Sequence, residues 1–371
     1  MRALCVAAAA AALIVFAATP ARATLTEVEQ RDRIRLEVSH AEEQLRNSGM
    51  LVGDPALDAY LQEVIDRLFP DRKGELHVRG IHDSEFNAFA MPSGSIYFHT
   101  GALLRIQDEA QLASILGHEG THYTADHAFK QVVHAKHAIG ASMVGSLVVP
   151  FLADVVAISS MAGFSREHER EADQKGIERM SQCGYDPQAG AEIMGRMDRE
   201  LTARGITHGG YFWADHPKIQ ERVASLGAFA TAHPGSTERD RERYLTATES
   251  ARMEVLAIIH RRLDGKLLVF LLDDEKLLDT LPPRAHFYLA EGLRLRGKPG
   301  DSERAISEYA ATIKLAPDDA KAYQALGIRY MRDGRKAEAL ALLRQYVALE
   351  HDETRTGYAR QYIATLEEEK P

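Results

Sequence analysis

The chain has few cysteines and no excess of basic over acidic residues. Its 371 residues include two cysteines, Cys5 and Cys183, and one tryptophan. Two cysteines cannot form the several bridges that hold a small disulfide-rich scaffold together, so that class is excluded. Lys and Arg number 45 against 54 Asp and Glu, which gives a formal net charge of −9. Because there is no basic excess, nucleic acid is not an expected partner.

The composition is otherwise that of a globular protein, with 45% hydrophobic and 27% charged residues. The length is enough for two domains of roughly 150 residues each. Apolar residues at helical spacing, and a few short alternating segments, predict an α+β fold that is mostly helical with a small β-sheet. The expected helices are 28–47, 55–69, 109–133 and 165–183, and the expected strands are 76–81, 87–91 and 95–99.

The first 23 residues have the three parts of a secretory signal peptide. Arg2 supplies the positive end, residues 4–18 are apolar, and Ala21-Arg22-Ala23 is a small-x-small cleavage site. A membrane anchor is the alternative, but the apolar run is shorter than the ~20 residues that span a bilayer. We predict that residues 1–23 are a signal peptide and that the mature protein is periplasmic.

Residues 138–164 are nearly all apolar and allow two interpretations. One is a membrane span, which would make the protein an integral-membrane protein. The other is a buried or lid-like helical hairpin broken at Pro150, which we favour because Asp154 in mid-span would cost a few kcal/mol in lipid. Peripheral association of this segment with a membrane is compatible with the second interpretation.

Two segments near the C-terminus repeat one another. Three matched pairs of residues are each 34 apart: Ala305 and Ala339, Tyr309 and Leu343, and Leu315 and Leu349. Gly292 and Gly327 are 35 apart, which places one extra residue in the first turn. A 34-residue period with small residues at helix crossings is typical of tetratricopeptide repeats, and a generic helical bundle is the alternative.

The charged segment 231–248 contains Pro and Gly and marks the expected domain boundary. We predict a first domain over 24–230, a linker with capping helices over 231–284, and a tetratricopeptide-repeat domain over 285–371. Two repeats rarely stand alone, so the helices of 250–280 should pack against them as a cap.

The motif His118-Glu119-Gly120-Thr121-His122 carries the chemistry. On a helix, residues four apart lie on nearly the same face, so both imidazoles can bind one Zn²⁺. Glu119 lies beside them and can take a proton from water. The sequence before the motif is mostly apolar and compatible with a helix, as this interpretation requires.

A second acidic motif follows on a later predicted helix. Glu169 and Asp173 are four residues apart and share a helical face, so Glu169 can be the third metal ligand. Asp173 can hydrogen-bond a ligand histidine from behind and fix its tautomer. Two histidines and one glutamate leave a position open, as in catalytic zinc sites. The alternative is that Glu167, Glu169 and Glu171 simply form a solvated charged face.

Four motifs occur in an order and spacing that few protein families share. In order along the chain they are 87–94, His118-Glu119-x-x-His122, Ser165-Arg166 with Glu169-x-x-Ala172-Asp173, and His216-Pro217 with Arg222. This order resembles the gluzincin metallopeptidases of the HtpX and CAAX-prenyl-protease superfamily. The greatest resemblance is to its BepA-like periplasmic branch, which carries tetratricopeptide repeats.

The resemblance implies that His118, His122 and Glu169 bind one Zn²⁺ and that Glu119 is the base. It also implies that the strand near Met91–Phe98 lies beside the cleft, where a polypeptide substrate would add as a further strand. Gly120 is a departure, since glycine inside a helix costs roughly 1 kcal/mol relative to alanine.

His216 and Arg222 border the active site in the families that the chain resembles. His216 can donate to the oxyanion of a tetrahedral intermediate, or occupy the open zinc position and keep the enzyme latent. The plain alternative is a turn histidine, with Arg222 pairing a nearby acid. Four further histidines are interpreted as surface or core residues rather than ligands: His127, His134, His137 and His168.

The sequence thus predicts a zinc metalloendopeptidase that cleaves polypeptides. By resemblance, its role is protein quality control or outer-membrane protein assembly, with the repeats recruiting clients or a protein partner such as the outer-membrane assembly machinery. The alternative is a latent or non-proteolytic chaperone or assembly factor that uses the repeat domain.

Overall fold

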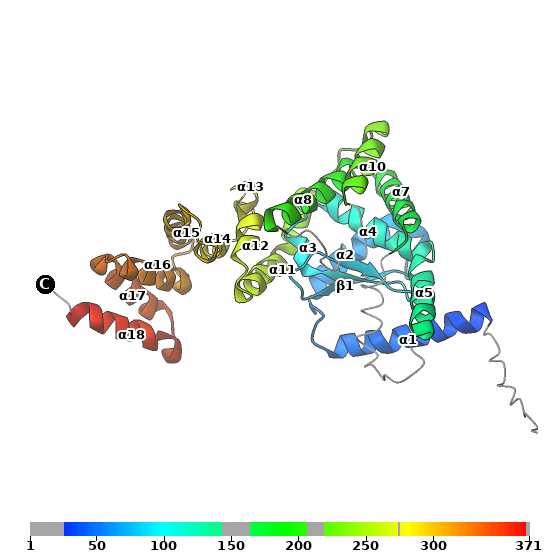
Figure 1. The fold of residues 1–371 in the computed structure, drawn as a ribbon. Coiled ribbons are helices and arrows are strands. Elements are labelled where there is room, and N and C mark those ends of the chain that lie inside the picture. The colour runs from blue at the N-terminus through cyan, green and yellow to red at the C-terminus, as the bar shows by residue number, and fades with distance from the viewer. Residues whose placement is uncertain (1–25, 143–163, 206–218, 274, 369–371) are drawn as a thin grey trace, which may run out of the picture.

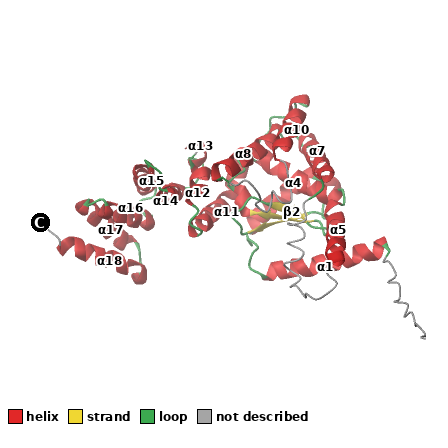
Figure 2. Cartoon of the chain, in the orientation of Figure 1, coloured by secondary structure: helices red, strands yellow, loops and turns green. Residues whose placement is uncertain are grey.

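The computed structural model describes residues 26–142, 164–205, 219–273 and 275–368. Figure 1 shows an N-terminal part, built from a small sheet and helices α1 to α10, and a row of helices, α12 to α18, that leads away from it toward the C-terminus. We call these parts the body and the arm. Strands occur only in the body among the residues drawn as helix, strand or loop (Figure 2), which confirms the mostly helical α+β prediction. No helix within the described ranges combines the length and apolar character that a bilayer crossing requires.

The first two helices begin at side-chain caps. Thr26 forms a capping box with Glu29 at the start of α1 (Glu27–Asn47). The side chain of each residue accepts a hydrogen bond from the backbone N–H of the other. Asp54 accepts from two backbone N–H groups at the start of α2 (Pro55–Leu68). Both helices match their predicted ranges. The one-turn helix η1 (Pro70–Arg72) follows.

The sheet has three strands in the order β1-β3-β2. The central strand, β3 (Ser95–His99), pairs in parallel with β1 (His77–Ile81) and antiparallel with β2 (Ala88–Ala90). Our prediction that a substrate adds at the Met91–Phe98 strand is therefore wrong, because both sides of β3 are already paired. Within the described chain, β2 is the edge strand on this side of the sheet.

The two faces of the sheet bury different partners. One face contributes Val78, Ile96 and Phe98 to the main core, which they share with α2 and with α4 (Glu109–Thr124). The other face contributes Phe89 and Tyr97 to a smaller core that includes residues of α1. The alternation of side chains along the strands explains this division.

The expected helix 109–133 is two helices, and the prediction of one continuous helix is wrong. After α3 (Thr100–Leu103), α4 runs over Glu109–Thr124 and α5 over His127–Ser142. Between them Asp126 has a left-handed backbone with φ 59°, which Asp tolerates better than most residues. Arg31 of α1 holds its carboxylate with two bonds of 3.1 Å. This distant ion pair stabilises a break that local sequence does not signal.

Helix α7 (Arg166–Gln182) crosses α4 at very short range. Ser165 caps its N-terminus, and Gly176 lies against Gly117 at the crossing. With no side chain on either glycine, the two backbones come into direct contact. This contact sets the distance between the two helices that carry the expected site.

We expect Gly176→Ala to destabilise the body. A Cβ there would lie 2.8 Å from the backbone nitrogen of His118, and backbone cannot rotate away. Overpacking of this kind costs about 1–3 kcal/mol, measurable by urea denaturation followed by circular dichroism. Gly195→Ala is the matched control, because its nearest neighbour is the flexible end of Arg199 at 3.6 Å. Equal stability of the two variants would contradict the close crossing.

Helix α11 (Arg241–Arg261) runs through much of the expected linker. Tyr244 and Ala251 of its first half belong to the main core of the body, whereas Val255 and Ile259 belong to the core of the arm. The helix therefore connects two cores without an intervening flexible segment. The domain limits 24–230, 231–284 and 285–371 stay predictions. The other helices of the body are α8 (Gln188–Arg204) and α10 (Ile219–Ala232).

The arm consists of short helices packed in sequence. Leu268 and Leu272 share a core with Tyr288 and Leu293, so the helices before residue 280 do pack against the repeated segments. The assignment of these segments as tetratricopeptide repeats stays a prediction. The helices are α12 (Gly265–Leu272), α13 (Glu275–Leu278), α14 (Arg284–Arg296), α15 (Asp301–Leu315), α16 (Ala320–Arg332), α17 (Lys336–Leu349) and α18 (Glu353–Glu368).

The arm should become less stable at acid pH because the Glu291 carboxylate becomes protonated. Burial raises the pKa of this carboxyl, but hydrogen bonds from His260, Arg294 and Tyr309 lower it from 4.5 to about 2. A carboxyl whose pKa is depressed in the fold stabilises it above the unfolded pKa. That stabilisation is lost as the pH falls through the folded value. We therefore expect about 3 kcal/mol to be lost between pH ~4.5 and ~2.

The measurement compares the unaltered chain with Glu291→Gln in urea titrations from pH 5 to pH 2. The difference in unfolding free energy between the two should shrink as the pH falls, since the variant has no carboxyl to protonate there. A difference that does not change with pH would contradict the assignment.

Candidate metal centre

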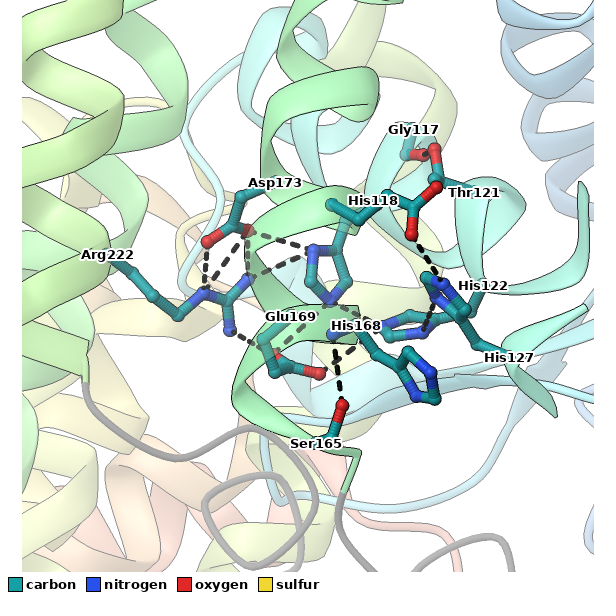
Figure 3. A network of polar contacts seen from close by, with 11 residues as sticks. Gly117, His118, Thr121, His122, His127, Ser165, His168, Glu169, Asp173 and Arg222 are labelled. Atoms are coloured by element: carbon teal, nitrogen blue, oxygen red, sulfur yellow. Dashed lines mark hydrogen bonds and ion pairs between the residues drawn. The ribbon is translucent and has the colours of Figure 1, made fainter. Parts of the chain in front are cut away.

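Helix α4 places His118 and His122 on one face, as their four-residue spacing predicts. Both side chains are buried, and their Nε2 atoms lie 3.0 Å apart (Figure 3). Asp108 caps the start of this helix through the backbone N–H of Gln111. The two imidazoles therefore stand on a rigid element and converge on one point.

Glu169 of α7 completes a triangle with the two histidines. Its Oε1 lies 3.3 Å from Nε2 of His122, and its Oε2 lies 3.8 Å from Nε2 of His118. Zinc bonds of about 2.0–2.1 Å in tetrahedral geometry hold ligand atoms about 3.3–3.4 Å apart. The observed distances of 3.0, 3.3 and 3.8 Å bracket this spacing, and the donor set of two imidazoles and one carboxylate suits Zn²⁺. One ligand atom from each of these residues lies within 4.8 Å of the others.

Asp173 lies one turn after Glu169 and bonds the far side of His118. Nδ1 of His118 lies 2.9 Å from Oδ1 of Asp173 and donates to it, so Nε2 keeps its lone pair for a metal. The guanidinium of Arg222 in turn donates to both oxygens of Asp173, the shortest contact being 2.7 Å. Figure 3 shows the three side chains in mutual contact, since Nη2 of Arg222 also lies 3.2 Å from Nδ1 of His118.

The charges of Asp173 and Arg222 in this cluster stabilise each other. Burial raises the pKa of Asp173, but Arg222 and the hydrogen bond from His118 hold it well below its ordinary value. Burial lowers the pKa of Arg222, but Asp173, Glu169 and Glu119 raise it above its ordinary value. Arg222 is thus a cation buried among carboxylates, which is the plainer of the alternatives that the sequence left open for it.

Glu119 is fully buried on α4, between the two histidines in sequence. The next residue, Gly120, makes room for an aromatic ring: a Cβ there would lie 2.4 Å from a ring atom of Phe69. The glycine therefore permits α2 and α4 to pack closely beside the motif. This accounts for the departure noted in the sequence.

Three contacts on the other side of His122 were missed in the sequence. Nδ1 of His127 lies 3.2 Å from Nδ1 of His122, and Nε2 of His127 lies 3.2 Å from Oε2 of Glu171. The ring of Phe164 stacks on His122 with 3.6 Å between centroids. Burial lowers the pKa of His127, which favours its neutral form. The five-residue spacing of His122 and His127 was the available signal, but in one continuous helix it would separate them.

The remaining predicted residues fall into two groups. His216, with its two proposed roles, and most of the apolar segment 138–164 lie outside the described residues. His168 is described and stacks on His127 with 4.1 Å between ring centroids, so it lies near the centre without joining the triangle.

Comparison with known proteins places this geometry in a family. Residues 54–239, half of the chain, match Peptidase family M48. The chain belongs to this family. The matched segment contains all the described residues of the centre, from the motif on α4 to Arg222 on α10.

Several relatives of this M48 protein are named proteases. A Vibrio cholerae protein that carries the name beta-barrel assembly-enhancing protease is 27% identical to this chain. The match covers 66% of this chain and 60% of that protein. The Escherichia coli K12 beta-barrel assembly-enhancing protease is 33% identical over 39% of this chain and 34% of its own. The mitochondrial metalloendopeptidase OMA1 of Schizosaccharomyces pombe is 29% identical over 49% of this chain and 51% of its own length. The chain thus spans between a third and three fifths of the length of these curated relatives.

Proposed function

We propose that this M48 protein is a zinc-dependent endopeptidase of the periplasm that acts in the quality control or assembly of outer-membrane proteins. The observation that carries the proposal is the buried triangle of His118, His122 and Glu169 with Glu119 on the same helix as the histidines. The names of the bacterial relatives support the link to outer-membrane assembly. The signal peptide predicted over residues 1–23 supports the location.

In this proposal each residue has a definite task. Zn²⁺, when bound by His118, His122 and Glu169, supplies Lewis acidity toward the scissile carbonyl. Glu119 takes the proton of the attacking water and returns it to the leaving amine. Asp173 fixes the tautomer of His118, and Arg222 keeps Asp173 ionised. His216 as an oxyanion donor or a latent fourth ligand stays a prediction.

The edge strand β2 is the proposed place for the substrate backbone. The backbone N–H of His99 donates to the carbonyl of Asn87, and that of Met91 donates to the carbonyl of Ser95. The backbone groups of Ala88 and Ala90 therefore point away from β3 by alternation. An extended polypeptide can pair with them and gain backbone hydrogen bonds with little dependence on sequence. Contacts between β2 and α4 keep this edge next to the helix that carries His118.

The arm is the proposed recruitment site for a client or a protein partner. A cavity of about 430 Å³ opens along α16, where Lys321, Ala325, Ile328 and Arg332 recur at helical spacing and line it, with Phe287 from α14. Apolar residues between two cations suit a protein segment that carries both apolar and acidic side chains. The outer-membrane assembly machinery is one such partner by analogy with the relatives' names.

The alternative of a latent or non-proteolytic assembly factor is tested by the same experiment. Purified full-length chain should bind one Zn²⁺ and cleave unfolded casein, and a chelator should abolish cleavage until zinc is restored. Zinc binding without cleavage would favour the latent alternative. Absence of zinc binding would overturn the proposed peptidase.

A further inference from the structure

The break between α4 and α5 brings two histidines together that a straight helix would separate. Five residues along an α-helix correspond to about 140° around its axis, so His122 and His127 would face different directions. The left-handed backbone of Asp126 turns the chain instead, and His127 opens the next helix. Its buried ring then approaches His122, with 3.2 Å between the two Nδ1 atoms.

Proton positions along this contact follow from the role of His122. Its Nε2 faces Glu169 and the other histidine, so this atom must keep its lone pair to bind a metal. A neutral imidazole has one N–H, which must then be on Nδ1. His122 therefore donates from Nδ1, and Nδ1 of His127 must accept.

The same reasoning fixes the proton of His127. Because its Nδ1 accepts, its single N–H is on Nε2, which lies 3.2 Å from Oε2 of Glu171. Glu171 is an acceptor, and Lys175 one turn later holds its other oxygen with a bond of 2.6 Å. Lys175 and His127 both donate to Glu171, and His122 donates to His127. The three hydrogen bonds are therefore mutually consistent.

We propose that His127 is a positioning residue for the metal centre, and that it orients His122 as Asp173 orients His118. The two ligand histidines then have different supports. His118 has a buried carboxylate with an arginine, and His122 has the imidazole of His127 (Figure 3). Glu171 in turn bonds His127. This inference rests on the proposed zinc site and adds a residue to it. Loss of such a partner costs about 10–100-fold in metal affinity.

The test compares two substitutions at one buried position. His127→Asn keeps an acceptor bonded to Cγ, at the place that Nδ1 occupies in histidine, whereas His127→Leu fills similar space without any acceptor. Zinc affinity of the full-length chain is measured by competition with a chromophoric chelator. We expect His127→Leu to bind zinc 10–100-fold more weakly and His127→Asn to stay within about threefold of the unaltered chain. The Co²⁺-substituted leucine variant should also show altered ligand-field bands.

His168→Leu is the matched control, because among the described contacts this side chain stacks on His127 and does not bond a metal ligand, and it should leave zinc affinity unchanged. Unchanged affinity in His127→Leu, or equal losses in the leucine and asparagine variants, would overturn the inference. Failure of the unaltered chain to bind zinc would instead overturn the proposed function. If His127→Leu does not fold, ¹⁵N spectra of the unaltered zinc-loaded chain decide: a proton on Nε2 of His127 supports the inference, and one on Nδ1 overturns it.

Discussion

The Glu119→Gln variant should bind zinc as tightly as the unaltered chain and cleave casein about a thousandfold more slowly. Glutamine has the same size as glutamate, so the buried site can keep its packing and its three metal ligands. It cannot accept a proton near neutral pH, and therefore cannot activate water. Zinc content by mass spectrometry and initial cleavage rates give the two measurements.

The control for this variant is Glu63→Gln on α2, an exposed carboxylate that pairs with Arg243 at the surface. It removes the same charge from the body and should leave cleavage unchanged. Substantial cleavage by Glu119→Gln would remove Glu119 from the mechanism, even if zinc binding were intact.

His118→Ala should lose both the metal and the activity. The variant keeps only two of the three ligands, and it also leaves Asp173 and Arg222 without the imidazole that they orient. Because loss of an orienting partner alone costs about 10–100-fold in affinity, we expect zinc to bind more than about a hundredfold more weakly. Competition with a chelator measures this loss, and cleavage should fall to background.

His40→Ala provides the comparison, since His40 is exposed on α1 and outside the centre. It should bind zinc and cleave as the unaltered chain does. Full zinc affinity in His118→Ala would mean that the metal binds elsewhere, and the three-residue site would be wrong.

The local part of the centre could be predicted from sequence because helical spacing determines it. Four residues place His118 beside His122, and four residues place Glu169 beside Asp173, wherever the helices lie. The approach of α7 to α4 depends on Gly117 and Gly176 meeting at the crossing. Two separated glycines do not reveal by themselves that they touch, so the triangle was predicted through the motif and the resemblance.

Contacts between distant segments account for what the sequence did not reveal. The helix break at Asp126 depends on Arg31, 95 residues earlier, and this break is what brings His127 to His122. From the sequence alone, Glu171 is expected to be a solvated surface charge. Its buried partner, His127, reaches it only because of where α5 begins. The central place of β3 depends on parallel pairing with β1, which alternation of side chains cannot specify.

In the arm, too, the spacing of residues predicts the helices but not which helices they contact. The 34-residue spacing predicted paired helices, and the close approach of α16 and α17 at Gly327 fits it, with a Cβ there 3.0 Å from Leu343. Gly292, its counterpart in the repeat, instead faces α12, where a Cβ would lie 2.7 Å from Leu268. Equivalent positions of a repeat therefore meet different neighbours at the end of the array.

The most direct test is the zinc coordination of the unaltered full-length chain, measured by X-ray absorption at one equivalent of metal. We expect one tightly bound zinc per chain, with scattering from at least two imidazoles and from carboxylate oxygen, and without sulfur. Failure to take up zinc, or a shell of oxygen alone, would show that His118, His122 and Glu169 do not hold the metal together.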